Sequence, residues 1–96
     1  MMKKYELMYI LQPTMEEEAK TALVERLNGV LTNNGAEIIE SKEWGKRRFA
    51  YEIQDFKEGF YYLVTFKGEG KAIDEFSHVA NMNEDVLRYM TVRLPE

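Results

Sequence analysis

Four stretches of the chain alternate apolar with polar or small residues, and each of them predicts a β-strand. They cover residues 5–11, 36–53, 60–66 and 86–94. The first and third stretches are apolar or aromatic at most positions on both faces, which is typical of central strands. The second is charged and interrupted by Gly45, so we expect a long, bent strand at a sheet edge, followed by a turn over residues 55–59.

Two further stretches repeat apolar residues at intervals of three and four, which predicts amphipathic helices. The first helix should begin just after Thr14, because Thr14 and Glu17 have the spacing of a capping box. Its apolar face is expected to contain Met15, Ala19, Ala22, Leu23, Leu27, Val30 and Leu31. The second helix is predicted over residues 71–81, with Ala72, Ile73, Phe76, Val79 and Ala80 on one face.

The resulting order is β-α-β-β-α-β, and residues 1–96 are expected to form a single α+β domain. Right-handed crossovers and a hairpin between the second and third strands give a four-stranded antiparallel sheet with both helices on one face. Because the central strands are apolar on both faces, the uncovered face should expose an apolar surface that binds a partner. The alternative is that long Lys and Glu side chains and the curl of the sheet cover this face.

The composition narrows the possible chemistry. The 96 residues carry a net charge of −4, with no cysteine and a single histidine. A disulfide framework, a thiol nucleophile and a His-rich or Cys-rich metal site are therefore excluded, and no cofactor site is predicted. The apolar runs are too short for a membrane helix, and the start MMKKYE lacks the apolar stretch of a signal peptide, so we expect a cytoplasmic protein that has no contact with membranes.

Other candidate sites have simpler structural explanations. Glu16 to Glu18 would stabilise the start of the first helix, and His78 is expected on the surface of the second. Gly68-Glu69-Gly70 lacks the further glycine of a phosphate-binding loop. Trp44 would pack over the hairpin, with base stacking as the alternative. We therefore predict no catalytic residue and no enzymatic activity.

The positive charge is concentrated in one short segment. Residues 41–48 have a net charge of +3, whereas the stretches before and after them are acidic. Lys46, Arg47 and Arg48 follow one another on the predicted edge strand, so Lys46 and Arg48 would project to one side and Arg47 to the other. These side chains suit contacts with nucleic-acid phosphates. The alternative is a solvated edge that charge protects against aggregation.

The run from Trp44 to Ile53, WGKRRFAYEI, resembles the signature of the bacterial small ribosomal subunit protein S6 family. The opening Tyr5-Glu6 strand followed by Pro13, the triplet Gly59-Phe60-Tyr61 and the segment RYMTV at 88–92 are similar to other parts of the family pattern. The resemblance covers roughly residues 3–94. It implies a ferredoxin-like βαββαβ fold and a structural role in translation. It further implies binding to the central domain of 16S rRNA together with the small basic ribosomal protein S18, as a heterodimer, during assembly of the 30S subunit.

On this basis, the residues expected to contact rRNA are Lys46, Arg47 and Arg48, with Tyr51 beside them and with Lys3, Lys4 and Arg93 as weaker candidates. The residues expected to form the protein-partner surface are Tyr61, Leu63, Tyr89 and Met90. No small-molecule substrate is expected. Two alternatives stay open. One is a small-molecule-binding regulatory domain of the same fold. The other is a single-strand RNA binder like the RNA-recognition motif, whose third-strand pattern fits Gly59, Phe60 and Tyr62 but not Glu58, Tyr61 or Thr65.

Overall fold

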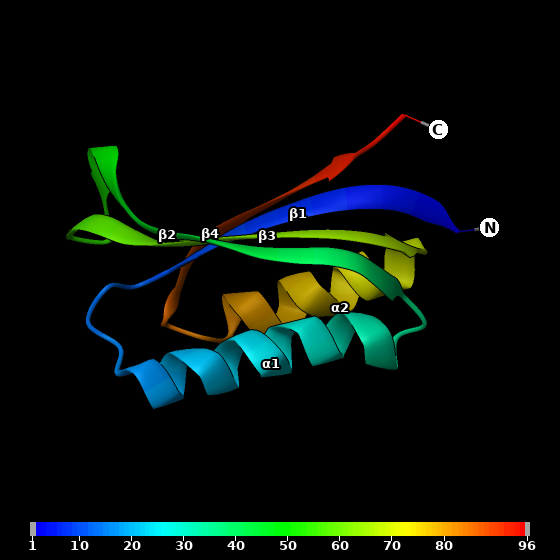
Figure 1. Cartoon of the computed structure of the whole chain (residues 1–96), viewed down its shortest axis with the longest axis horizontal. Coiled ribbons are helices and arrows are strands. Elements are labelled where there is room, and N and C mark those ends of the chain that lie inside the picture. The colour runs from blue at the N-terminus through cyan, green and yellow to red at the C-terminus, as the bar shows by residue number, and fades with distance from the viewer. Residues whose placement is uncertain (1, 96) are drawn as a thin grey trace.

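The computed structural model describes residues 2–95 and has the predicted β-α-β-β-α-β order (Figure 1). The elements are β1 (Lys3–Leu11), α1 (Glu17–Asn33), β2 (Glu37–Ile53), β3 (Phe56–Gly68), α2 (Gly70–Asn81) and β4 (Val86–Arg93). The strands pair in the order β2-β3-β1-β4, and every neighbouring pair is antiparallel. This confirms the predicted ferredoxin-like fold, with β1 and β3 in the centre of the sheet and β2 at an edge.

Both helices lie against the same face of the sheet, which Figure 1 shows below the strands. This covered face contains the side chains of alternate residues on the two central strands. Tyr9 of β1 lies at its centre, where its ring stacks on Tyr62 with centroids 5.3 Å apart and tilts against Phe76 of α2 at 5.7 Å. The core around these rings consists mainly of Leu7, Leu11, Leu23, Leu27, Leu31, Val64, Phe66, Ala72 and Ala80.

The start of α1 differs from the sequence prediction. The helix begins at Glu17 with Glu16 as its N-cap, and no side chain caps it. Thr14 does not form the predicted capping box, because its backbone N–H and its hydroxyl both donate to the Gln12 side-chain oxygen. Ala19 and Ala22, expected on the apolar face, are exposed, and a lysine, Lys20, is buried instead.

Neither helix within residues 2–95 is both long enough and apolar enough to cross a membrane.

The turn between β2 and β3 is shorter than predicted. Residues 55–59 were expected to form it, but Ile53 already pairs with Phe56, so only Gln54 and Asp55 connect the strands. Both have positive φ values, of 49° and 69°. Two such residues give a turn whose twist matches that of the flanking strands, so Ile53 and Phe56 pair directly beside it, after a register shift between Arg48 and Ile53. As a result, β3 begins four residues before the predicted start at Phe60.

Gly59 of β3 packs too closely against its neighbours to accept a side chain. A methyl group at this position would lie 2.7 Å from Ile10 Cγ2 and 2.9 Å from both the Leu11 carbonyl oxygen and Phe49 Cζ. One of these neighbours is backbone, so the clash cannot be relieved by side-chain rotation alone.

We therefore expect Gly59→Ala to lower the free energy of unfolding by about 1–3 kcal/mol, as other overpacked core sites do. Chemical denaturation of the purified protein measures this change. The control is Gly70→Ala at the start of α2, where nothing lies within 4 Å of the new methyl group, so stability should not fall. Equal stability of the two variants would contradict the close packing described here.

Candidate nucleic-acid and partner interface

The edge hairpin extends into an arm that carries most of the predicted RNA-binding residues. We call residues 44–58 the hairpin arm. In Figure 1 its end curls upward at the left, toward the sheet face that the helices leave uncovered, which we call the open face. The arm begins at a β-bulge between Glu43 and Gly45, where Gly45 has a φ of 85°. A side chain at that φ would be strained, so glycine suits this bend.

The bulge decides which way each basic side chain points. Before it, Glu43 pairs with Tyr62 of the helix-covered face, and after it, Arg47 pairs with Gly59 of the open face. Lys46, opposite Phe60, therefore lies on the helix side and Arg47 on the open side. This agrees with the expectation that consecutive cations project to opposite sides of the edge strand.

The three cations have different surroundings. Lys46 Nζ lies 3.8 Å from Glu58 Oε1 and 5.4 Å from the centre of the Phe60 ring, so a carboxylate partly offsets its charge. The Arg47 guanidinium lies over the Trp44 ring at 5.3 Å, and this stacking leaves its edge N–H groups available to an anion. Within residues 2–95, no ion pair involves Arg47 or Arg48. The two arginines are thus better placed than Lys46 to bind a phosphate.

Tyr51 lies near the end of the arm and is 84% exposed. Its ring is therefore accessible to a base or to another flat group, as a contact with RNA beside the arm's cations would require.

The weaker candidates lie at the other end of the sheet. Lys4 pairs with Lys67 and Arg47 with Gly59, so eight residues of β3, or about 26 Å, separate the two sites. Arg93 lies next to the start of β1, opposite Tyr5, and Lys3 is one residue before Lys4. The structure therefore does not bring Lys3, Lys4 and Arg93 together with the arm.

The open face has an apolar hollow of about 460 Å³ between the arm and the central strands. Phe49 of the arm packs against Tyr61 with ring centroids 6.0 Å apart. Ile10 lies close to the same site and is buried. Met90, also in the lining, is 54% exposed, and Val92 beyond it is 47% exposed. The expected apolar surface therefore exists, but the arm covers one end of it.

Three of the four predicted partner residues lie on this open face. Met8 pairs with both Leu63 and Met90, and Tyr61 pairs with Ile10. The side chain of Tyr89 points to the other face, because neighbouring residues in a strand point to opposite sides. Its ring packs edge-on against Phe76 of α2 at 5.9 Å, and its hydroxyl donates to Asn81 Oδ1.

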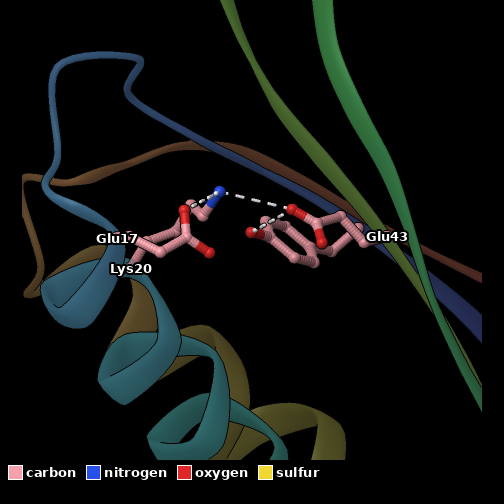
Figure 2. A network of polar contacts seen from close by, with 4 residues as sticks. Glu17, Lys20 and Glu43 are labelled. Carbon is pink, nitrogen blue, oxygen red and sulfur yellow. Dashed lines mark hydrogen bonds and ion pairs between the residues drawn. The ribbon is translucent and has the colours of Figure 1, made fainter.

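A polar network joins the arm's base to the first turn of α1 (Figure 2). We call Glu17, Lys20, Glu43 and Tyr62 the Lys20 network. Lys20 Nζ lies 3.0 Å from Glu17 Oε2 and 3.3 Å from Glu43 Oε1, and the Tyr62 hydroxyl donates to the same Glu43 oxygen. Lys20 is only 6% exposed, and its ammonium lies 3.9 Å from the centre of the Phe60 ring.

The network changes the ionisation of two groups. Burial lowers the pKa of the Lys20 ammonium, but hydrogen bonds to Glu17 and Glu43 outweigh it and leave this pKa above its ordinary value. For Tyr62, burial and the negative charge of Glu43 raise the pKa of the phenol to about 12. Lys20 therefore stays charged and Tyr62 stays neutral near pH 7.

Two residues of this region were not singled out from the sequence. Lys20 interrupts the apolar spacing of α1, and nothing local indicates that Glu43 and Phe60 reach it across the fold. Arg88 lines the open-face hollow beside Met90. The alternation of β4 could have found Arg88, because it lies two residues before Met90 and so on the same face.

Within residues 2–95, no three His, Asp or Glu side chains gather closely enough to hold a metal ion.

Comparison with known proteins gives a family and a fold. A profile of the family described as ribosomal protein S6 matches residues 4–93. The crystal structure of 30S ribosomal protein S6 from Thermotoga maritima is similar with a TM-score of 0.93 and 30% sequence identity, over 98% of this chain and 89% of that one. A homoserine dehydrogenase from Thiobacillus denitrificans has a TM-score of 0.65 at 11% identity, over 18% of its own chain, and this likeness shows the fold alone.

The Lys20 network predicts a loss of stability at alkaline pH. The raised pKa of Tyr62 means that the folded state favours the protonated phenol. Its contribution to the free energy of unfolding is therefore fully present below about pH 10 and is lost as the pH rises toward 12. The raised pKa of Lys20 acts in the same direction. We expect Tyr62→Phe to make the free energy of unfolding fall less steeply between pH 10 and 12 and to leave its slope unchanged near pH 7.

Denaturation curves at a series of pH values test this. Tyr51→Phe removes the same hydroxyl from an exposed ring on the arm and should reproduce the wild-type slope. An identical alkaline slope for Tyr62→Phe and the wild type would contradict the expectation.

Proposed function

Because the chain belongs to the ribosomal protein S6 family, we propose that it is a structural, non-catalytic constituent of the bacterial small ribosomal subunit. There it binds the central domain of 16S rRNA together with protein S18 during 30S assembly. The observation that carries this proposal is the hairpin arm, which presents at the edge of the sheet two arginines that form no ion pair with any residue of the described range 2–95. The proposed location is accordingly the cytoplasmic ribosome.

The charge of the chain supports a shared rather than a solitary RNA contact. Phosphate neutralisation dominates the affinity of proteins for nucleic acids, and this chain has a net charge of −4. Its cations on the arm are few, and Glu58 partly offsets Lys46. A small basic partner such as S18 would supply further positive charge and would be attracted by the acidic remainder of the chain.

The arm has the geometry for contacts with the RNA backbone. Arg47 projects toward the open face and Lys46 toward the helix side, so the edge strand can lie along a backbone with cations on both sides. Arginine binds phosphate oxygens through two N–H groups at once. Tyr51, exposed near the end of the arm, would stack on an unpaired base beside this contact.

The open face fits the protein partner. Leu63, Met90 and the partly covered Tyr61 form an apolar surface next to the arm, and exposed apolar surfaces of this kind usually bind another chain. Because the arm borders this surface, a partner bound there would lie beside the RNA contact and could bind the same RNA segment.

We expect the double variant Arg47→Ala, Arg48→Ala to weaken binding of the S18 complex to a 16S central-domain fragment by at least about tenfold, since two charge-assisted contacts are lost. The dependence of log affinity on log salt should fall by about 1.5 for the two contacts. Filter binding at several salt concentrations measures both quantities.

The matched control is Arg26→Ala, which removes an exposed cation from α1 and should change neither quantity. An unchanged affinity and salt slope for the double variant would reject the phosphate role of the arm. Tight binding by the chain without S18 would favour the single-strand RNA-binding alternative.

We also expect Met90→Glu to reduce the affinity for S18 by at least about tenfold, because docking would bury an unpaired carboxylate. Calorimetric titration of S18 into the variant measures this. Met82→Glu, at an exposed site next to the end of α2, makes the same change on the helix side and should bind S18 normally. If the two variants behaved alike, the open face would not be the partner surface.

A further inference from the structure

The orientation of the hairpin arm depends on a small number of contacts. Beyond the bulge, β2 pairs only with β3, and most of its side chains are exposed. At the far end, the Gln54 side chain donates to the Leu87 carbonyl oxygen across the open face. At the base, the arm meets the helix layer through the Lys20 network. Between these two points, Phe49 packs against Tyr61 on the open face. These contacts hold the middle and the tip of the arm, so the direction in which the ribbon leaves the sheet depends on how its base is fixed.

Lys20 is well placed to fix that base. Its ammonium contacts Glu43, the last paired residue before the bulge, and lies over the ring of Phe60, which pairs with Lys46 on the other side of the bulge. Figure 2 shows the side chains of Glu17 and Lys20, from α1, reaching toward Glu43 on β2. The contacts of one ammonium group therefore span the point at which the strand changes direction.

The burial of Lys20 makes this arrangement specific. The Lys20 side chain is covered by its neighbours, and its ammonium lies between the carboxylates of Glu17 and Glu43, so separating them leaves its charge less well compensated. The side chains of Glu17 and Glu43 are largely exposed, with 78% and 50% of their surfaces accessible. Water already solvates these carboxylates, so the ion pairs stabilise them little. Lys20 thus selects one position of Glu43, and with it one direction of the arm.

We propose that Lys20 is a positioning residue for RNA binding: through Glu43 and Phe60 it holds the hairpin arm in the direction that presents Arg47 and Arg48 to the RNA backbone. This inference rests on the proposed binding of 16S rRNA. A residue that only stabilised the fold would affect all surfaces equally, whereas Lys20 acts on the arm and leaves the open face near Met90 and Val92 as it is.

The size of the effect follows from the population of the correct arm direction. The apparent affinity is the intrinsic affinity multiplied by the fraction of molecules in the binding-competent state. If loss of the Lys20 contacts leaves about one fifth of the molecules in that state, rRNA binding weakens by about fivefold. Binding of S18 through Met90 should change much less.

The test measures arm direction and RNA affinity in the same variants. The chain contains no cysteine, so spin labels can be placed at Glu25→Cys on α1 and Glu52→Cys on the arm without further substitutions. Pulsed electron paramagnetic resonance (double electron–electron resonance) then gives the distribution of distances between the two spin labels, and so between α1 and the arm. Lys20→Met removes the charge and keeps the length of the side chain, and Glu43→Gln weakens the pair while keeping a polar partner for Tyr62.

We expect a narrow distance distribution in the wild type, a broader or shifted one in both variants, and about fivefold weaker rRNA binding by their S18 complexes. The control is Val79→Ala, which removes core packing on α2 and lowers stability without touching the arm. It should keep both the wild-type distances and the wild-type RNA affinity.

An unchanged distance distribution in both Lys20→Met and Glu43→Gln would overturn the inference, as would an equal loss of RNA affinity in Val79→Ala. Absence of rRNA binding by the wild-type complex would overturn the proposed function instead, and the distances would still show whether Lys20 fixes the arm.

Discussion

Two helices of 17 and 12 residues can cover only one face of a four-stranded sheet, and both central strands of this sheet are apolar on both faces. On the covered face, residues such as Leu7 and Val64 lose all contact with solvent. On the other face the hairpin arm covers part of the sheet in place of a third layer: Phe49 packs against Tyr61, and the Gln54 side chain reaches the Leu87 carbonyl oxygen of β4. The remaining apolar surface around Met90 is thus a direct result of the βαββαβ order, and binding another chain is the simplest way to cover it.

The distribution of charge follows the same division. The arm that shields one end of the open face also carries Lys46, Arg47 and Arg48, so the surfaces proposed to bind protein and RNA share a border. On the helix side, Lys20 forms ion pairs with Glu17 of α1 and with Glu43 at the base of the arm, and the two carboxylates leave this group with a net negative charge. Arg47 and Arg48 then lie at the boundary between an apolar surface and an acidic body, which is the part of the molecule that suits the proposed contact with an anionic backbone.

Much of the fold could be predicted from the sequence because it depends on local patterns. The strand order, the edge position of β2 and the bend at Gly45 all follow from alternation, charge and one glycine. The details that failed have different causes. The burial of Lys20 depends on a distant partner, Glu43, 23 residues away, whereas the predicted capping box at Thr14 is replaced by hydrogen bonds to Gln12, two residues away. Tyr89 was placed beside Met90 on one surface although alternation separates them. The distance of Lys3 and Lys4 from the arm follows from the register of β1 on β3, which no single segment determines.

The bulge at Trp44 has a consequence for how this hairpin can change in length. Its one extra residue reverses the parity of the strand, so that Ser41 and Glu43 before it lie on the helix side, whereas Gly45 and Arg47 after it lie on the open side. Deletion of that single residue would exchange the sides of the residues from Gly45 to Arg48, up to the next register shift, turning Arg47 toward α1 and the two flanking cations away from it. Insertions or deletions of two residues would preserve the sides. The segment should therefore tolerate length changes in even steps and resist odd ones.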